Sequence, residues 1–154
     1  MLKIRTANRA ASEVQAPLTL LLTRRVTFSA AHVLRRADWD EERNRAIFGA
    51  CAGDHGHNYV LEVSIGGDPD PETGMVLNLK DLDRVVREAL VAHVDHRHLN
   101  RDVPFLLGVI PTAENLALAF WDRLEDSLRE STPGARLRRL RLVESENNAV
   151  EVWR

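Results

Sequence analysis

The sequence predicts an α+β fold in which an antiparallel four-stranded sheet carries two helices on one face. Strand-like segments form a first pair and a last pair, two segments with helical spacing lie between them, and no internal repeat breaks this order. With 154 residues the chain is most simply one domain that buries a substantial core. We expect a single domain over residues 18–154, preceded by a mobile N-terminal extension at residues 1–17.

The first two strands are expected at residues 18–29 and 58–65. The earlier segment has strand composition with imperfect alternation, whereas the later one alternates cleanly and places four apolar side chains on one face: Tyr59, Leu61, Val63 and Ile65. The polar segment 33–53 between them has few periodic apolar residues, which predicts a long loop, with or without a helical turn. A loop of that length in a compact domain is more often functional than idle.

Two helices are expected in the middle of the chain. The first begins behind Asn78 as its N-cap and ends near the histidine-rich run 93–98. The second begins behind Thr112 and stops at Pro133-Gly134. Both carry apolar residues at three- and four-residue spacing, which predicts that each packs one face against the sheet.

The last two strands are expected at residues 136–144 and 149–153, joined at Asn147-Asn148, because asparagine tolerates the positive φ angles of tight turns. A sheet with two outer strands needs its edges covered or paired, and assembly with other copies is one solution.

Composition argues against several classes of function. The formal net charge of −2 leaves no basic surface, so we expect no nucleic-acid partner. The longest uncharged apolar run, residues 16–22, is too short to cross a membrane. One cysteine cannot form an intrachain disulfide, and residues 1–15 lack the apolar stretch of a signal peptide. We therefore expect a cytoplasmic protein, with a transit peptide as the less favoured alternative.

Three histidines suggest a metal site. His55 and His57 lie two residues apart, so strand alternation points both imidazoles the same way, and His32 lies beside the other early strand. Three neutral imidazoles suit a catalytic Zn²⁺ with one position left open. The alternative is that His55 and His57 are ordinary polar residues at the start of a strand, since spacing does not show that the two strands meet.

The remaining candidates each allow two interpretations. Cys51 is either a small buried hydrophobe or, in a glycine-flanked loop, a reactive thiol that needs a nearby positive centre or base. Asp95 and His96 are either a carboxylate–imidazole couple or, as the residues by themselves favour, polar groups at a solvated helix end. Glu144 would be buried, and would require a partner, if Leu140 and Leu142 share its face and point inward.

Six motifs in one order make the chain resemble the 6-pyruvoyltetrahydropterin synthase / 6-carboxytetrahydropterin synthase family from about Val26 to Trp153. They are Phe28 to His32, Cys51 to Tyr59, Thr73 to Leu79, Asp95 to Asn100, Pro111 to Asn115, and Glu144 to Asn148. The resemblance implies a lyase with the tunnelling fold, whose trimers stack into a homohexamer around a central barrel. It also implies that the active sites lie between subunits.

The resemblance also implies roles for nine residues. His32, His55 and His57 match zinc ligands, and Cys51, Asp95 and His96 match catalytic groups. Glu144 matches the carboxylate that anchors the pterin, while Thr112 and Glu114 match residues lining the pterin pocket. The implied cofactor is Zn²⁺ and the implied substrate is 7,8-dihydroneopterin triphosphate.

The family forms two products. The three-residue gap between Cys51 and His55 matches the carboxy-forming enzymes of queuosine and deazapurine biosynthesis. Residues 73–79, 103–105 and 144–148 instead resemble the pyruvoyl-forming enzymes of tetrahydrobiopterin biosynthesis. Because we give more weight to the gap between Cys51 and His55, we expect the product to be 6-carboxy-5,6,7,8-tetrahydropterin, formed with release of acetaldehyde and triphosphate. The alternatives are a 6-pyruvoyltetrahydropterin synthase acting on the same substrate, a non-catalytic pterin-binding protein, and a structural zinc protein with Cys51 as fourth ligand.

Overall fold

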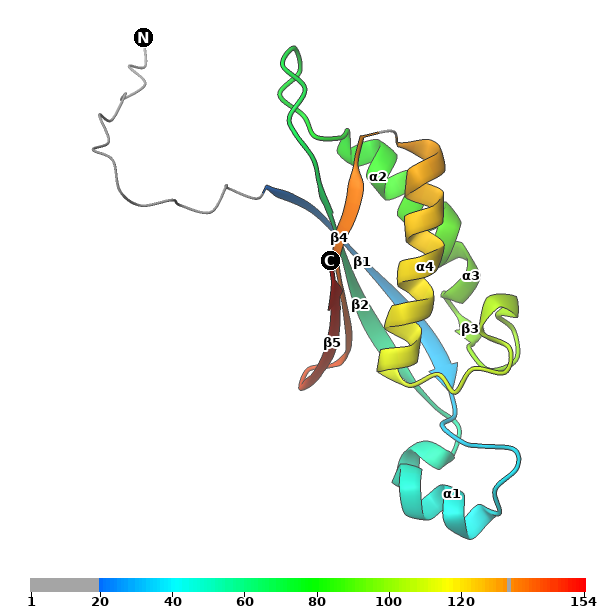
Figure 1. The fold of residues 1–154 in the computed structure, drawn as a ribbon. Helices are drawn as coiled ribbons and strands as arrows, with labels where there is room; N and C mark the ends of the chain where they lie inside the picture. The colour runs from blue at the N-terminus through cyan, green and yellow to red at the C-terminus, as the bar shows by residue number, and fades with distance from the viewer. Residues whose placement is uncertain (1–19, 133) are drawn as a thin grey trace, which may run out of the picture.

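The computed structural model describes residues 20–132 and 134–154, so the expected extension at residues 1–17 lies outside the described residues. A single sheet carries its helices on one face, while α1 projects beyond one end of the sheet (Figure 1). Within the described residues, no helix is both long enough and apolar enough to cross a membrane.

The sheet has five strands in the order β3-β1-β2-β4-β5. The central strands β1 (Leu21–His32) and β2 (His55–Gly66) pair antiparallel along their full length, and β4 (Arg136–Ser145) and β5 (Asn148–Trp153) extend the sheet antiparallel on the β2 side. The fifth strand, β3 (Arg97–His98), pairs parallel with the end of β1. The expected four strands are confirmed, but two residues are too few for β3 to show an alternating pattern in the sequence.

Two helical segments cover the sheet. The first is α2 (Leu79–Val86), which continues through a π-helical turn, η2 (Arg87–Val91), into α3 (Ala92–Val94). The second is α4 (Ala113–Ser131), preceded by the short 3₁₀ turn η3 (Pro104–Leu106). Both expected N-caps are confirmed: the Asn78 side chain accepts a hydrogen bond from the backbone N–H of Lys80, and Thr112 accepts one from Asn115.

The expected loop at residues 33–53 is wrong in part, because it contains the helix α1 (Glu41–Phe48) and the 3₁₀ turn η1 (Gly49–Ala52). Asp40 caps α1 by accepting a hydrogen bond from the backbone N–H of Arg43, and two glutamates in the first turn favour the helix dipole. The only buried side chain of α1 is Asn44, so the helix has no apolar stripe that a period search would detect.

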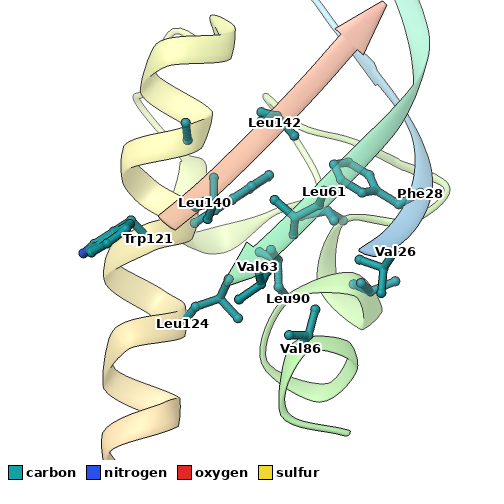
Figure 2. Close-up of a cluster of buried hydrophobic side chains, with 14 of the residues drawn as sticks. Val26, Phe28, Leu61, Val63, Val86, Leu90, Trp121, Leu124, Leu140 and Leu142 are labelled. Atoms are coloured by element: carbon teal, nitrogen blue, oxygen red, sulfur yellow. The ribbon is translucent and has the colours of Figure 1, made fainter. Parts of the chain in front are cut away.

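The core lies between the sheet and the two helical segments, where alternate strand residues meet the apolar stripes of α2 and α4 (Figure 2). The expected inward face of β2 is confirmed, since all four of its apolar side chains are fully buried. Phe28 stacks on Tyr59 with ring centroids 4.8 Å apart and meets Phe120 edge-on. This packing fixes the helix-facing side of β1 and β2, on which the candidate metal residues also lie.

Candidate metal centre and active site

Three histidines meet where β1 ends and β2 begins. The register pairs His32 with His55 and Ala30 with His57, so adjacent strands bring the imidazoles together. Their ring centroids are 4.4 to 5.1 Å apart, and one nitrogen from each ring lies within 4.8 Å of the other two. These residues could hold a metal ion, and strand pairing supplies the proximity that spacing in the sequence did not show.

Backbone carbonyls orient two of the three rings. The Nδ1 atom of His32 lies 2.9 Å from the carbonyl oxygen of Pro111, and Nδ1 of His55 lies 2.9 Å from that of Gly53. A carbonyl only accepts, so each Nδ1 carries the proton and donates it. The Nε2 atoms of His32 and His55 are buried and have no hydrogen-bond partner within residues 20–132 and 134–154. Unpartnered Nε2 atoms on rings that are held by a hydrogen bond at Nδ1 are the donor set that a bound Zn²⁺ requires.

The environment of His32 keeps its imidazole neutral. Burial, by removing the charged form from water, lowers the pKa of His32 to about 4, and the neighbouring histidines lower it further against the opposing hydrogen bond to Pro111. The ring therefore carries no proton on Nε2 at neutral pH, and its lone pair is free to bind a cation.

Glu144 lies beside the cluster. It shares the inward face of β4 with Leu140 and Leu142, both fully buried, and its own side chain is 18% exposed. Its Oε1 atom lies 3.8 Å from Nε2 of His32 and 3.9 Å from Nε2 of His57. The pairing of β4 with β5 is irregular between Val143 and Ser145, and such a bulge re-aims the side chain at its centre. Glu144 is therefore only partly buried, and it lies beside the histidine cluster at distances longer than a hydrogen bond.

Asp95 and His96 lie at the solvent-exposed end of α3, as the residues by themselves suggested, and their side chains are also in contact. Oδ1 of Asp95 lies 2.9 Å from Nδ1 of His96 and also accepts a hydrogen bond from the backbone N–H of Ser29. That bond from Ser29, with a smaller contribution from His96, lowers the pKa of Asp95. His96 has φ +56°, an uncommon conformation for a residue other than glycine, and its side chain is 82% exposed. A carboxylate thus orients an imidazole whose far side meets solvent.

Cys51 lies in the turn η1 and is half-buried. The backbone of this turn is anchored to the chain that leaves β1, because the N–H of Leu34 donates to the carbonyl of Cys51 at 2.8 Å. Within the described chain, no hydrogen bond or ion pair joins Cys51 to Asp95 or His96. A single copy of the chain therefore does not assemble these three residues into one contacting set.

Thr112 and Glu114 lie at the start of α4. Thr112 caps this helix and directly follows Pro111, whose carbonyl holds His32. Glu114 is exposed on the first turn. Thr112 is therefore tied to the histidine cluster through the backbone, whereas Glu114 faces solvent.

One pair of residues near the cluster was not predicted from the sequence. Nε2 of His98 lies 2.8 Å from Oδ1 of Asp54, and this hydrogen bond is the main reason that the pKa of Asp54 is lowered. His57, His96 and His98 all line one hollow of roughly 500 Å³ between β1, β2 and β3. The available signal was the histidine-rich run together with the acidic residue directly before His55.

Comparison with known proteins identifies the family of the chain. The model of the family described as 6-pyruvoyl tetrahydropterin synthase matches residues 21–154. A 6-pyruvoyl tetrahydrobiopterin synthase of Dictyostelium discoideum is 41% identical over 132 residues, which cover 86% of this chain and 94% of that protein. A protein of Archaeoglobus fulgidus, named among the 6-carboxy-5,6,7,8-tetrahydropterin synthases, is 38% identical over 104 residues, or 68% of this chain and 79% of that one.

Solved structures show the same fold. The 6-pyruvoyl tetrahydropterin synthase of Caenorhabditis elegans superposes with a TM-score of 0.80 and 30% identity, covering 89% of this chain and 96% of that one. The expected tunnelling fold is therefore confirmed, and the chain belongs to the 6-pyruvoyl tetrahydropterin synthase family of lyases.

Proposed function

We propose that the protein is a zinc-dependent 6-pyruvoyltetrahydropterin synthase, which eliminates triphosphate from 7,8-dihydroneopterin triphosphate. The observation that carries the proposal is the cluster of His32, His55 and His57, in which the Nε2 atoms of His32 and His55 are buried and unpartnered. When bound there, Zn²⁺ would supply Lewis-acid chemistry that makes the hydroxyls of the pterin side chain, and the C–H bonds beside them, more acidic.

The relatives favour the pyruvoyl product over the carboxy product that we expected from the gap between Cys51 and His55. The Dictyostelium relative matches 86% of this chain, whereas the archaeal carboxy-type relative matches 68%. There is also a physical reason to give the gap less weight. The position of the thiol loop depends on its anchors, which include the bond from Leu34 to Cys51 and the pair Asp54–His98, as well as on its length.

The chain's own residues have complementary tasks in this proposal. Asp95 orients the imidazole of His96, so that its exposed side can take or give a proton. Cys51 moves a proton at the other side of the substrate side chain, as a thiolate. Glu144 accepts two hydrogen bonds from N–H groups of the pterin, a charge-assisted contact that fixes the substrate's register.

We further propose that the enzyme works as a homohexamer, a dimer of trimers, in the cytoplasm. Exposed apolar side chains lie at the start of β1 and at the end of the edge strand β5, where a neighbouring copy would cover them: Leu20, Leu21 and Trp153. Sites built between copies would also account for Cys51 having no contact with Asp95 and His96 in one chain. Residues 18–154 would act as a single catalytic domain.

The test is product analysis by mass spectrometry after zinc-loaded protein has been incubated with 7,8-dihydroneopterin triphosphate. 6-Pyruvoyltetrahydropterin and triphosphate without acetaldehyde are the expected products. Acetaldehyde with 6-carboxytetrahydropterin would overturn the product assignment and restore the gap as the better guide. Tight pterin binding without turnover would instead favour the non-catalytic alternative.

A further inference from the structure

We propose that the pair Asp54–His98 positions the loop that carries Cys51. Asp54 belongs to the short connection between η1, which contains the thiol, and His55 at the start of β2. Its Oδ1 atom lies 2.8 Å from Nε2 of His98. His98 belongs to β3, the strand that directly follows the Asp95–His96 couple. One side-chain contact thus links the thiol loop to the segment that carries the second proton-transfer group.

His98 is the fixed partner in this contact. Its side chain is 10% exposed, and its backbone pairs with Ala31 at the end of β1. The backbone N–H of His98 donates to Asp102 at 2.9 Å, and that of Leu99 donates to the carbonyl of Ala31 at 2.8 Å. The Asp54 side chain is 68% exposed and would otherwise be free to move in water. Pairing therefore orders the loop residue against a rigid edge of the sheet.

The other anchors of the loop are built from backbone carbonyls. The Cys51 carbonyl accepts from Leu34, the Gly53 carbonyl holds Nδ1 of His55, and the Gly53 N–H donates to Ala50. The contact between Asp54 and His98 is a side-chain connection, which a substitution can remove without altering a metal candidate or a backbone group. It is also the connection that reaches β3.

The same geometry argues against a direct catalytic or metal-binding role for His98. Its Nε2 atom is occupied by Asp54, and its Nδ1 atom is buried without a hydrogen-bond partner in the described part of the chain. His98 also lies outside the group of histidines that could hold a metal ion in the described chain. His98 is therefore a positioning residue, which acts through the loop it holds.

The chain offers a direct probe of this loop, because Cys51 is its only cysteine. The rate at which iodoacetamide alkylates the zinc-loaded protein reports on the thiol loop whether or not the enzyme turns over a pterin. The role of the pair in turnover rests on the proposed function, but the alkylation measurement does not. A failure of the proposed function is thus distinguishable from a failure of the proposed positioning role.

The experiment is a double-mutant cycle with His98→Ala, Asp54→Ala and the double variant. We expect each single variant to be alkylated several-fold faster, to keep its zinc, and to lose kcat by roughly 10- to 100-fold with a smaller change in KM, since a misplacement of about 1 Å has effects of this size. The double variant should be no worse than either single one, because both remove the same contact.

Conservative variants keep the test decisive if a truncation fails to fold. His98→Gln retains an N–H donor near the Nε2 position, and Asp54→Asn retains the acceptor, so each should restore most of the wild-type alkylation rate and kcat. Arg101→Gln is the matched control, because Arg101 lies 3.6 Å from the same carboxylate but is exposed and should contribute little. Unchanged alkylation in a folded His98→Ala protein, or effects that multiply in the double variant, would overturn the proposal.

Discussion

The carboxylate of Glu144 faces the imidazole of His32, with Oε1 3.8 Å from Nε2. This separation is too long for a hydrogen bond. The three histidines are the group that could hold a metal ion in the described chain, and Glu144 lies at the border of that group. Its proposed role is therefore to bind the substrate beside the metal.

The variant Glu144→Gln distinguishes a role of Glu144 in binding the pterin from a role as a metal ligand. Loss of a charge-assisted hydrogen bond should raise KM for the pterin roughly 10- to 100-fold, equivalent to about 1.5–3 kcal/mol, while zinc affinity measured by chelator competition stays unchanged. Glu146→Gln, at an exposed position in the following turn, serves as the control. A variant that loses zinc affinity and keeps its KM would assign Glu144 to the metal instead.

Cys51→Ala should keep the fold and the zinc but lower kcat by roughly 10²- to 10⁴-fold, because a positioned proton-transfer group contributes about that much. Circular dichroism, zinc content and turnover number check the three parts of this expectation. Cys51→Ser, which keeps a weaker proton donor at the same place, should lie between alanine and the wild type. Full activity of the alanine variant would exclude the thiol from catalysis, and a large loss of zinc would favour the closed four-ligand site.

Gly56→Ala should weaken the metal centre without touching a candidate ligand. A Cβ atom at Gly56 would lie 2.9 Å from the carbonyl oxygen of Ala30, so β1 and β2 would have to separate between His32 and His57. We expect a lower zinc affinity and a loss of about 1–3 kcal/mol in the free energy of unfolding, the usual cost of overpacking.

The matched control for Gly56 is Gly53→Ala, where the nearest atom to the new Cβ is 3.5 Å away, an ordinary contact. Isothermal titration with Zn²⁺ and urea denaturation compare the two variants. Equal zinc affinity in both would mean that the strand separation at Gly56 does not set the geometry of the histidines.

The zinc-free protein should lose stability on mild acidification. Burial lowers the pKa of His32 to about 4 in the folded state, whereas a histidine in the unfolded chain titrates near ~6.5. Between these values the unfolded state binds more protons, so the free energy of unfolding falls as the pH falls and this contribution levels off below about pH 4. The whole difference corresponds to about 3 kcal/mol.

Urea denaturation of the zinc-free protein at several pH values between about 7 and 4 measures this effect. His32→Gln cannot titrate at this position, so its stability should decline less over the same window. Parallel pH profiles for the two proteins would show that His32 is not held in its neutral form by burial.

The strands and helices with strong periodic patterns were predictable from the sequence. The alternation of Tyr59 to Ile65 identified the inward face of β2, and the cap at Thr112 identified the start of α4. The helix α1 was missed because its stability comes from the Asp40 cap and its charged first turn, which leave no apolar period. The strand β3 was missed because it exists only through pairing with β1.

The candidate site was likewise predictable from the sequence only in part. Alternation predicted that His55 and His57 point together, but only the register of β1 against β2 brings His32 to them. The Asp95–His96 contact was not evident from the sequence, because His96 adopts a positive φ that a local sequence does not reveal. The Asp54–His98 pair joins residues 44 positions apart, and nothing local connects them.

The π-helical turn Arg87–Val91 affects where Asp95 lies relative to the sheet. Such a turn holds an extra residue, and removing it would turn everything downstream by about 100° and shift it by about 1.5 Å along the helix. Deleting one residue here would make the helix more regular, but it would swing Asp95 away from the Ser29 amide that holds it. The number of residues between Leu79 and Asp95 therefore sets the position of Asp95 against β1. A deletion that made the helix more regular would separate Asp95 from Ser29 and disrupt the proposed proton-transfer couple.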